Sequence, residues 1–121
     1  MKVLLVDDER DILVQGKKFL EKIDDRFDVR TAPSVSEGLE ILNMDFDAVI
    51  SDYKMPDMDG LDFLEVVRSM GYELPFIIFT GKAGKKTALE AMKLGADHFV
   101  MKGDDPRKQY KGFADKFLEK I

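Results

Sequence analysis

The chain has 121 residues, of which 45% are hydrophobic, so it is long enough for one well-packed domain and short for two. It has no cysteine, which excludes disulfides and thiolate metal sites, and its formal net charge of −5 argues against general binding to nucleic acids. An acidic pair follows the first six residues, too early for a signal peptide, and no apolar run could cross a bilayer. We therefore expect a single cytoplasmic domain over residues 1–121 that does not act at a membrane.

The first two predicted strands, residues 3–6 and 27–31, are separated by a predicted helix. The first strand segment is continuously apolar, which is typical of a strand buried on both faces of a parallel sheet. The second alternates between apolar and charged residues, which predicts a half-exposed strand at an edge of the sheet. An apolar stripe at helical spacing predicts the helix between them: Ile12, Gly16, Phe19, Leu20 and Ile23.

The middle of the chain predicts two helices and two buried strands, the strands at residues 48–50 and 76–79. Ser34 followed by Glu37 is typical of a capping box and predicts the start of the earlier helix, because each side chain can satisfy a free amide at the helix end. The later helix follows the third strand. The inward-facing positions of the two helices are Val35, Leu39 and Leu42, and then Leu61, Leu64 and Val67.

The end of the chain predicts a fourth helix, a fifth buried strand at residues 99–101 and a last helix. Gly95 is expected to end the fourth helix, and Pro106 to open the fifth, since these residue types are favoured at those positions. The apolar positions are Ala88, Ala91 and Met92 in the fourth helix, and Tyr110, Phe113, Ala114, Phe117 and Ile121 in the fifth.

Strands that alternate with helices predict a doubly wound α/β fold: a parallel sheet with right-handed crossovers and helices on both faces. Such sheets bind ligands beyond the carboxyl ends of their strands. The residues directly after the predicted strands are Asp7 and Asp8, Asp52, Thr80, and Lys102. If the first and third strands are neighbours, three carboxylates converge beside a hydroxyl and an ammonium group.

Crowded carboxylates repel one another unless a cation lies between them, and Mg²⁺ prefers such oxygen ligands. The same arrangement would let Asp52 attack a phosphoryl donor and form an aspartyl phosphate. Taken singly, each residue has a plainer interpretation. An Asp after a strand often caps a helix, Asp52 could be a turn residue, and Lys102 could face solvent. Their joint occurrence at strand ends favours a site.

Four segments resemble the signature motifs of response-regulator receiver domains. They are Leu-Val-Asp-Asp-Glu at 5–9, Asp-Tyr-Lys-Met-Pro-Asp-Met-Asp-Gly at 52–60, Phe-Thr-Gly-Lys at 79–82 and Gly-Ala-Asp-His-Phe-Val-Met-Lys at 95–102. The resemblance covers the whole chain in order. It implies a flavodoxin-like fold with five helices and a five-stranded sheet in the order 2-1-3-4-5.

The resemblance also implies roles for individual residues. Asp52 would accept the phosphoryl group, with Thr80 and Lys102 contacting it. Asp8, Asp52 and the backbone carbonyl of Lys54 would hold Mg²⁺ or Mn²⁺, with Asp7 helping directly or through water. Thr80 and Phe99 would form a switch pair.

The function implied is a phosphorylation-activated switch of a two-component system that catalyses only its own phosphorylation and dephosphorylation. A histidine kinase, a phosphotransfer protein or a small phosphodonor would supply the phosphoryl group. The expected output surface is helix 4, strand 5 and helix 5, which would contact a downstream protein, a fused output domain or a second copy of the chain, and not DNA. Six basic residues are expected there: Lys85, Lys86, Lys93, Arg107, Lys108 and Lys111.

Three departures from the receiver pattern stand out. Gly103 occupies the place where the family usually has proline, so a trans or remodelled loop is expected there. Phe99 replaces a frequent tyrosine and lacks its hydroxyl. Lys54 and Lys82 add two cations beside Asp52. His98, the single histidine, is interpreted as a surface or strand-edge residue.

Two other functions compete with the switch. A pseudo-receiver would be a pure interaction module that takes no phosphate, which the full set of acidic residues with Thr80 and Lys102 disfavours. A hydrolase with an aspartyl nucleophile would need two aspartates spaced two residues apart after the first strand, and Asp7-Asp8-Glu9 lacks that spacing.

Overall fold

The computed structural model describes residues 1–119, which form five strands that alternate with five helices. The strands are β1 (Lys2–Val6), β2 (Asp28–Ala32), β3 (Ala48–Ser51), β4 (Phe76–Thr80) and β5 (His98–Met101). The helices are α1 (Arg10–Ile23), α2 (Val35–Ile41), α3 (Gly60–Ser69), α4 (Lys85–Lys93) and α5 (Pro106–Leu118). In this part of the chain, no helix is both long and apolar enough to cross a membrane.

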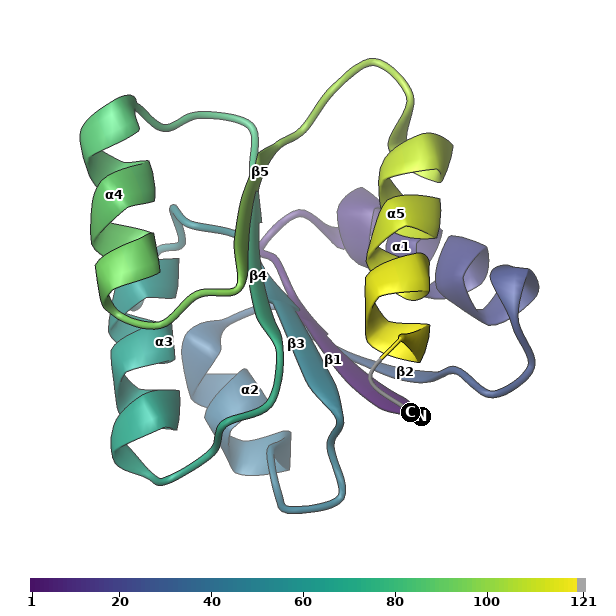
Figure 1. Cartoon of the computed structure of the whole chain (residues 1–121), viewed down its shortest axis with the longest axis horizontal. Helices are drawn as coiled ribbons and strands as arrows, with labels where there is room; N and C mark the ends of the chain where they lie inside the picture. The colour runs from purple at the N-terminus through teal and green to yellow at the C-terminus, as the bar shows by residue number, and fades with distance from the viewer. Residues whose placement is uncertain (120–121) are drawn as a thin grey trace.

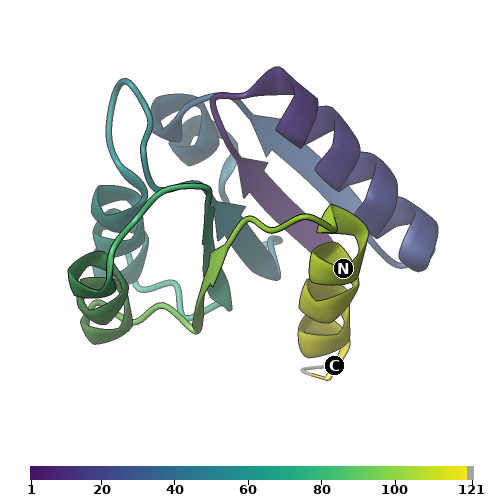
Figure 2. The same ribbon diagram turned by 90° about the horizontal axis from the view of Figure 1, so that it is seen from above.

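All strand pairs are parallel and the sheet order is β2-β1-β3-β4-β5, so the predicted doubly wound fold and its strand order are confirmed. The sheet separates two helical layers. Helices α1 and α5 cover one face, and α2, α3 and α4 cover the other (Figures 1 and 2). The topology reverses at β1 and β3, where Val6 lies opposite Ser51. Their next residues, Asp7 and Asp52, therefore leave the sheet side by side.

Each face of the sheet has its own hydrophobic core, because successive side chains of a strand point to opposite faces. Leu4 and Val6 of β1 belong to the core under α2, α3 and α4, whereas Val3 and Leu5 belong to the core under α1 and α5. All four side chains are at most 1% exposed. This double burial explains why the central strands are continuously apolar.

The outer elements differ from the predicted pattern in several places. Strand β2 is the predicted half-exposed edge strand, although it begins one residue later than expected. Strand β5 was predicted to be buried on both faces, and this is wrong because it forms the opposite edge and its Met101 is 43% exposed. His98 lies on this edge strand, as interpreted from the sequence. Two residues assigned to apolar stripes, Ile23 and Met92, are exposed at 38% and 50%.

The helix ends follow the local sequence signals. The Ser34 hydroxyl accepts the Glu37 N–H at 3.2 Å, which confirms the predicted start of α2. Gly95 lies two residues after the end of α4 and has φ of +103°, and Pro106 is the first residue of α5. The buried positions of α5 also match the prediction: Tyr110, Phe113, Ala114 and Phe117. Ile121, which was predicted to extend this stripe, lies outside the described residues.

Candidate functional site

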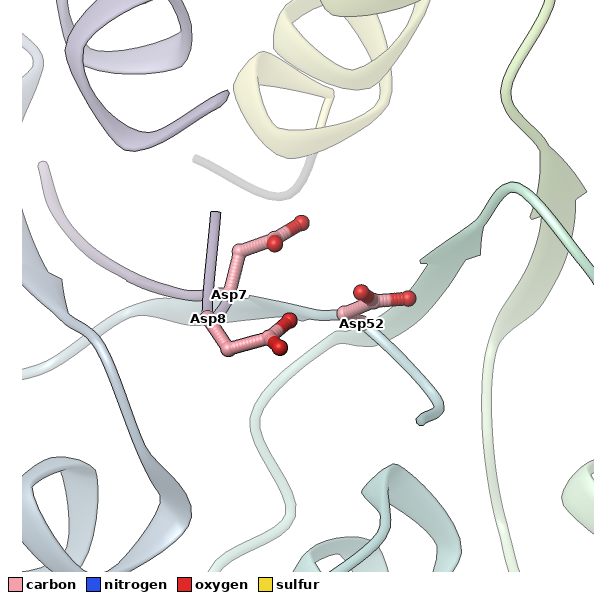
Figure 3. Close-up of side chains that lie close together, drawn as sticks. All are labelled: Asp7, Asp8 and Asp52. Atoms are coloured by element: carbon pink, nitrogen blue, oxygen red, sulfur yellow. The ribbon is translucent and has the colours of Figure 1, made fainter. Parts of the chain in front are cut away.

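Three carboxylates meet at the carboxyl ends of β1 and β3. Asp7 and Asp8 follow β1, Asp52 follows β3, and one carboxylate oxygen of each lies within 4.8 Å of the others. Figure 3 shows all three side chains gathered in the space between the two strand ends. Asp7 and Asp52 are buried, at 2% and 7% exposure, whereas Asp8 is exposed. The site therefore has a buried floor and one carboxylate at its opening.

Backbone hydrogen bonds hold the two buried carboxylates in place. The Asp7 N–H donates to the Ala32 carbonyl at 3.1 Å, and the Asp52 N–H donates to the Val6 carbonyl at 2.9 Å. Each bond continues the parallel ladder one residue past the strand. One oxygen of each side chain also accepts an amide N–H: Asp7 from Glu9 at 2.9 Å and Asp52 from Tyr53 at 2.7 Å. The sheet itself thus orients the carboxylates.

Lys102 is the cation that faces this cluster. Its Nζ lies 2.8 Å from Asp7 Oδ2 and 3.6 Å from Asp52 Oδ2, and its side chain is 17% exposed. Its backbone N–H donates to the Thr80 carbonyl at 2.8 Å, which joins the ends of β4 and β5. The residues predicted from the strand ends therefore converge, as expected for neighbouring parallel strands.

The charges in the site do not balance. Burial raises the pKa of Asp7 above its ordinary value of 3.8, an effect that outweighs its hydrogen bonds from Lys102 and from the Glu9 N–H. Burial alone would lower the pKa of Lys102, but its hydrogen bond to Asp7 and the charges of Asp7 and Asp52 raise it above 10.5. The cluster thus has three carboxylates, and the Lys102 ammonium group contacts two of them. Their oxygen donors fit a hard divalent cation such as Mg²⁺.

The remaining predicted residues lie on β4, on β5 and in the loop between β3 and α3. Thr80 ends β4 and is 2% exposed, and its hydroxyl accepts the Lys82 N–H at 3.4 Å. Phe99 is opposite Ile78 in the sheet and packs against the core under α2, α3 and α4. Thr80 and Phe99 therefore face the same layer of the molecule. Lys54 lies in the β3–α3 loop with an exposed side chain, so only its carbonyl could serve as an inward ligand.

The expected basic surface is divided between two faces of the molecule. Arg107 and Lys111 do not lie with α4 and β5. They line a groove of about 410 Å³ beside α1, together with Lys18, Phe19, Lys22 and Ile23. The Arg107 guanidinium lies 5.6 Å from the centre of the Phe19 ring. The prediction is therefore wrong for these two of the six candidate residues, which lie on the side of α5 that borders α1.

Gly60 is a site residue that the motif alone did not single out for a structural role. Its N–H donates to the Tyr53 carbonyl at 2.7 Å, which folds the loop back onto Asp52. A Cβ atom at this position would lie 2.2 Å from the backbone carbonyl oxygen of Asp52. Both groups are backbone-fixed, so a side chain here would displace the residue that carries the central carboxylate.

Gly60→Ala should therefore lower the free energy of unfolding by about 1–3 kcal/mol, as overpacking does in a rigid environment. Gly112→Ala is the matched control, because Gly112 lies inside α5 and a Cβ there meets nothing within 4 Å. The control should raise stability by about 0.5–1 kcal/mol, since alanine is the better helix former. Urea unfolding of both variants measures the difference. Equal changes in the two variants would contradict the proposed close approach.

Comparison with known proteins identifies the family of this chain. The family model for the response regulator receiver domain matches residues 3–111. The response regulator SaeR of Staphylococcus epidermidis is 33% identical over 106 residues, which cover 88% of this chain and 45% of SaeR. The chain thus spans about half the length of this relative.

Solved structures agree with the family match. A CheY-like response regulator receiver domain protein from Methanospirillum hungatei has 32% identity and a TM-score of 0.86, over 98% of this chain and 94% of that one. TrrA from Thermotoga maritima, a response regulator solved in complex with Mg²⁺ and BeF, has 26% identity and a TM-score of 0.80, over 96% and 97%.

Proposed function

This chain belongs to the response regulator receiver domain family of two-component systems, and we propose that it is a switch that takes a phosphoryl group onto Asp52 with the help of Mg²⁺ or Mn²⁺. The observation that carries the proposal is the cluster of three carboxylates within 4.8 Å, faced by one partly buried ammonium group. That arrangement is costly without a cation and suits phosphoryl transfer with one.

Each residue has a definite part in the proposed reaction. Asp8, Asp52 and the carbonyl of Lys54 would hold the metal ion, with Asp7 beside it or reaching it through water. When bound, the ion would neutralise charge on the phosphoryl oxygens. An oxygen of Asp52 would attack phosphorus, and the bond to the donor's leaving group would break with its electron pair. Lys102 would contact one phosphoryl oxygen and the Thr80 hydroxyl another.

The competing functions fit the structure less well. Burying Asp7 and Asp52 together, at 2% and 7% exposure, costs free energy, and a module that never binds phosphate would have no use for this arrangement. A hydrolase with its nucleophile after the first strand would place a pair of carboxylates on β1 alone. Here the central carboxylate comes from β3, and the two aspartates after β1 differ in burial.

The output would pass from Thr80 to Phe99 and the face of α4, β5 and α5. Phosphorylation adds close to two negative charges. A shift of the Thr80 hydroxyl towards them would change the packing on the layer that also holds Phe99. In this mechanism the charge of the phosphoryl group shifts the packing of Thr80 and Phe99 from one of two arrangements to the other. Couplings of this kind are typically about 1–3 kcal/mol, which changes partner affinity severalfold or more.

An amide chemical-shift map with beryllofluoride and Mg²⁺ tests this function. We expect changes around Asp52 that extend through Thr80 and Phe99 into α4. Asp28 and Val29, at the amino end of β2 and opposite Lys2 and Val3, lie away from the site, so they serve as an internal control and should stay unchanged. Omitting Mg²⁺ should remove the whole response. Changes confined to the surroundings of Asp52 would contradict the output route, and no change at all would contradict the switch.

The partners follow from this function. We infer that a histidine kinase, a phosphotransfer protein or a small phosphodonor supplies the phosphoryl group in a cytoplasmic setting. Since SaeR is about twice as long as the matched region, the output could lie in a fused domain, in a separate protein or in a second copy of this chain. The acidic net charge disfavours direct contact with nucleic acid.

A further inference from the structure

One side chain holds the backbone on both sides of Lys102. Gln109, in α5, donates its side-chain amide to the Met101 carbonyl at 2.7 Å. Its side-chain oxygen accepts the Gly103 N–H at 3.0 Å. The planar amide thus bridges the residue before Lys102 and the residue after it, and it ties the end of β5 to the second turn of α5.

The sheet does not provide this support by itself. Lys102 makes the last ladder bond, from its N–H to the Thr80 carbonyl at 2.8 Å. Strand β5 is the edge of the sheet, so its other side has no neighbouring strand in the described structure. The Met101 carbonyl and the Gly103 N–H would otherwise depend on solvent. Gly103 can take part because it has an N–H, which a proline at this position would lack.

The position of the Lys102 ammonium group depends on this backbone. A lysine side chain is long and flexible, and fixing it costs conformational entropy. Its Nζ must nevertheless stay 2.8 Å from Asp7 and 3.6 Å from Asp52. A backbone shift of about 1 Å at Lys102 would carry its ammonium group away from the carboxylates of Asp7 and Asp52. A misplacement of this size can slow a reaction strongly.

We propose that Gln109 is a positioning residue for phosphoryl transfer, which holds Lys102 towards Asp7 and Asp52 by clamping the two adjoining peptide groups. The inference rests on the proposed role of Lys102 at the phosphoryl group. The Lys102–Gly103 peptide bond is trans, as are the others in residues 1–119, so the clamp works on an ordinary backbone.

Gln109→Met tests the clamp, because methionine is similar in length and unbranched but cannot bridge two peptide groups. Gln15→Met is the matched control. Gln15 is an exposed residue of α1 that lines the same cavity of about 90 Å³ behind Lys102. With acetyl phosphate and Mg²⁺, the Gln109 variant should be phosphorylated about tenfold more slowly than the parent, while the control keeps the parental rate.

Two further readouts separate positioning from general damage. Mg²⁺ affinity, measured by amide shifts, should not fall in Gln109→Met, because Lys102 is not a metal ligand and moving its positive charge away from Asp7 and Asp52 favours a cation there. Amide hydrogen exchange at Gly103 should become faster in Gln109→Met and stay slow in the control. Gln109→Asn keeps an amide on a shorter side chain and should behave like the methionine variant. Agreement between the two variants would show that the effect does not come from a folding defect caused by one particular substitution.

The outcomes distinguish this inference from the function on which it rests. If the parent takes no phosphate, the proposed function fails, and exchange at Gly103 still decides whether the clamp exists. If the parent is phosphorylated and both Gln109 variants match it, the positioning role is overturned. A parallel loss of Mg²⁺ affinity and rate would overturn it as well, because the defect would then not be specific to Lys102.

Discussion

Asp52→Asn should abolish the phosphoryl adduct that acetyl phosphate forms on the parent protein in the presence of Mg²⁺. Asp52 is the one carboxylate of the cluster that directly follows the central strand β3, and its Oδ2 faces Lys102 at 3.6 Å. An asparagine keeps the shape of the side chain and its contact with the Tyr53 N–H, but the amide is not a nucleophile for phosphorus. Intact-protein mass spectrometry measures the adduct.

Asp57→Asn is the matched control in the same loop. Its carboxylate is directed away from the cluster, because one oxygen accepts the Ser36 N–H at 2.9 Å and the Ser36 hydroxyl at 2.8 Å. The control should therefore be phosphorylated like the parent. An excess of chelator should suppress the adduct in both the parent and the control. An adduct that persists in Asp52→Asn, or that forms equally well with chelator, would refute the assignment.

The central part of the fold could be predicted from sequence because its determinants are local. Continuous apolar runs mark β1, β3 and β4, since these strands are covered on both faces. The same reasoning failed for β5, whose residues 99–101 are equally apolar although the strand is only partly buried at the edge of the sheet. Hydrophobicity shows that a segment can be buried, and the strand order decides whether it is. That order came from the resemblance to receiver domains.

The candidate site was predictable for a related reason. Asp7, Asp52 and Lys102 each follow a strand directly, so parallel pairing alone brings them to one edge of the sheet. Gln109 and Gly60 gave no such signal. The Gln109 clamp needs the approach of α5 to the end of β5, and the close contact of Gly60 needs the return of the loop onto Asp52. Both are tertiary contacts between residues that no periodic pattern links.

The division of the basic residues has a geometric cause as well. Arg107 and Lys111 are four residues apart, so they share one face of α5, and in this structure that face borders α1. Lys108 is turned by about 100° from Arg107 around the same helix. Counting charge along the sequence could not separate the two faces, because the orientation of α5 is set by its buried aromatic residues.

Asp7→Asn should have opposite effects on stability and on metal binding. In the metal-free protein the buried Asp7 carboxylate lies beside Asp52, and burial raises its pKa above 3.8. Compared with the unfolded chain, the folded state therefore shifts Asp7 towards its uncharged form, which asparagine imitates. Replacing a buried, incompletely compensated charge should raise the free energy of unfolding by about 1–2 kcal/mol. The same change removes a negative charge from the site and should weaken Mg²⁺ binding by about tenfold.

The pH dependence distinguishes this explanation from a simple packing effect. A carboxyl group whose pKa is higher in the folded state binds more protons there, so its contribution to stability falls as the pH rises above its unfolded value. The advantage of Asp7→Asn over the parent should thus be small below pH 3.8, where Asp7 is mostly protonated in both the folded and the unfolded state, and should grow towards neutral pH. Thermal unfolding of both proteins across this range, without metal, measures it.

Asp8→Asn is the control for the stability effect, because Asp8 belongs to the same cluster but is exposed. It should change stability little, while Mg²⁺ binding weakens as in Asp7→Asn. Added Mg²⁺ should stabilise the parent more than either variant, since at a given concentration a ligand that binds more tightly stabilises the folded state more. A gain in Asp7→Asn that does not vary with pH would contradict the electrostatic origin. If the expected pattern holds, the cluster is destabilising by itself, and the metal ion on which the proposed switch depends is also what compensates it.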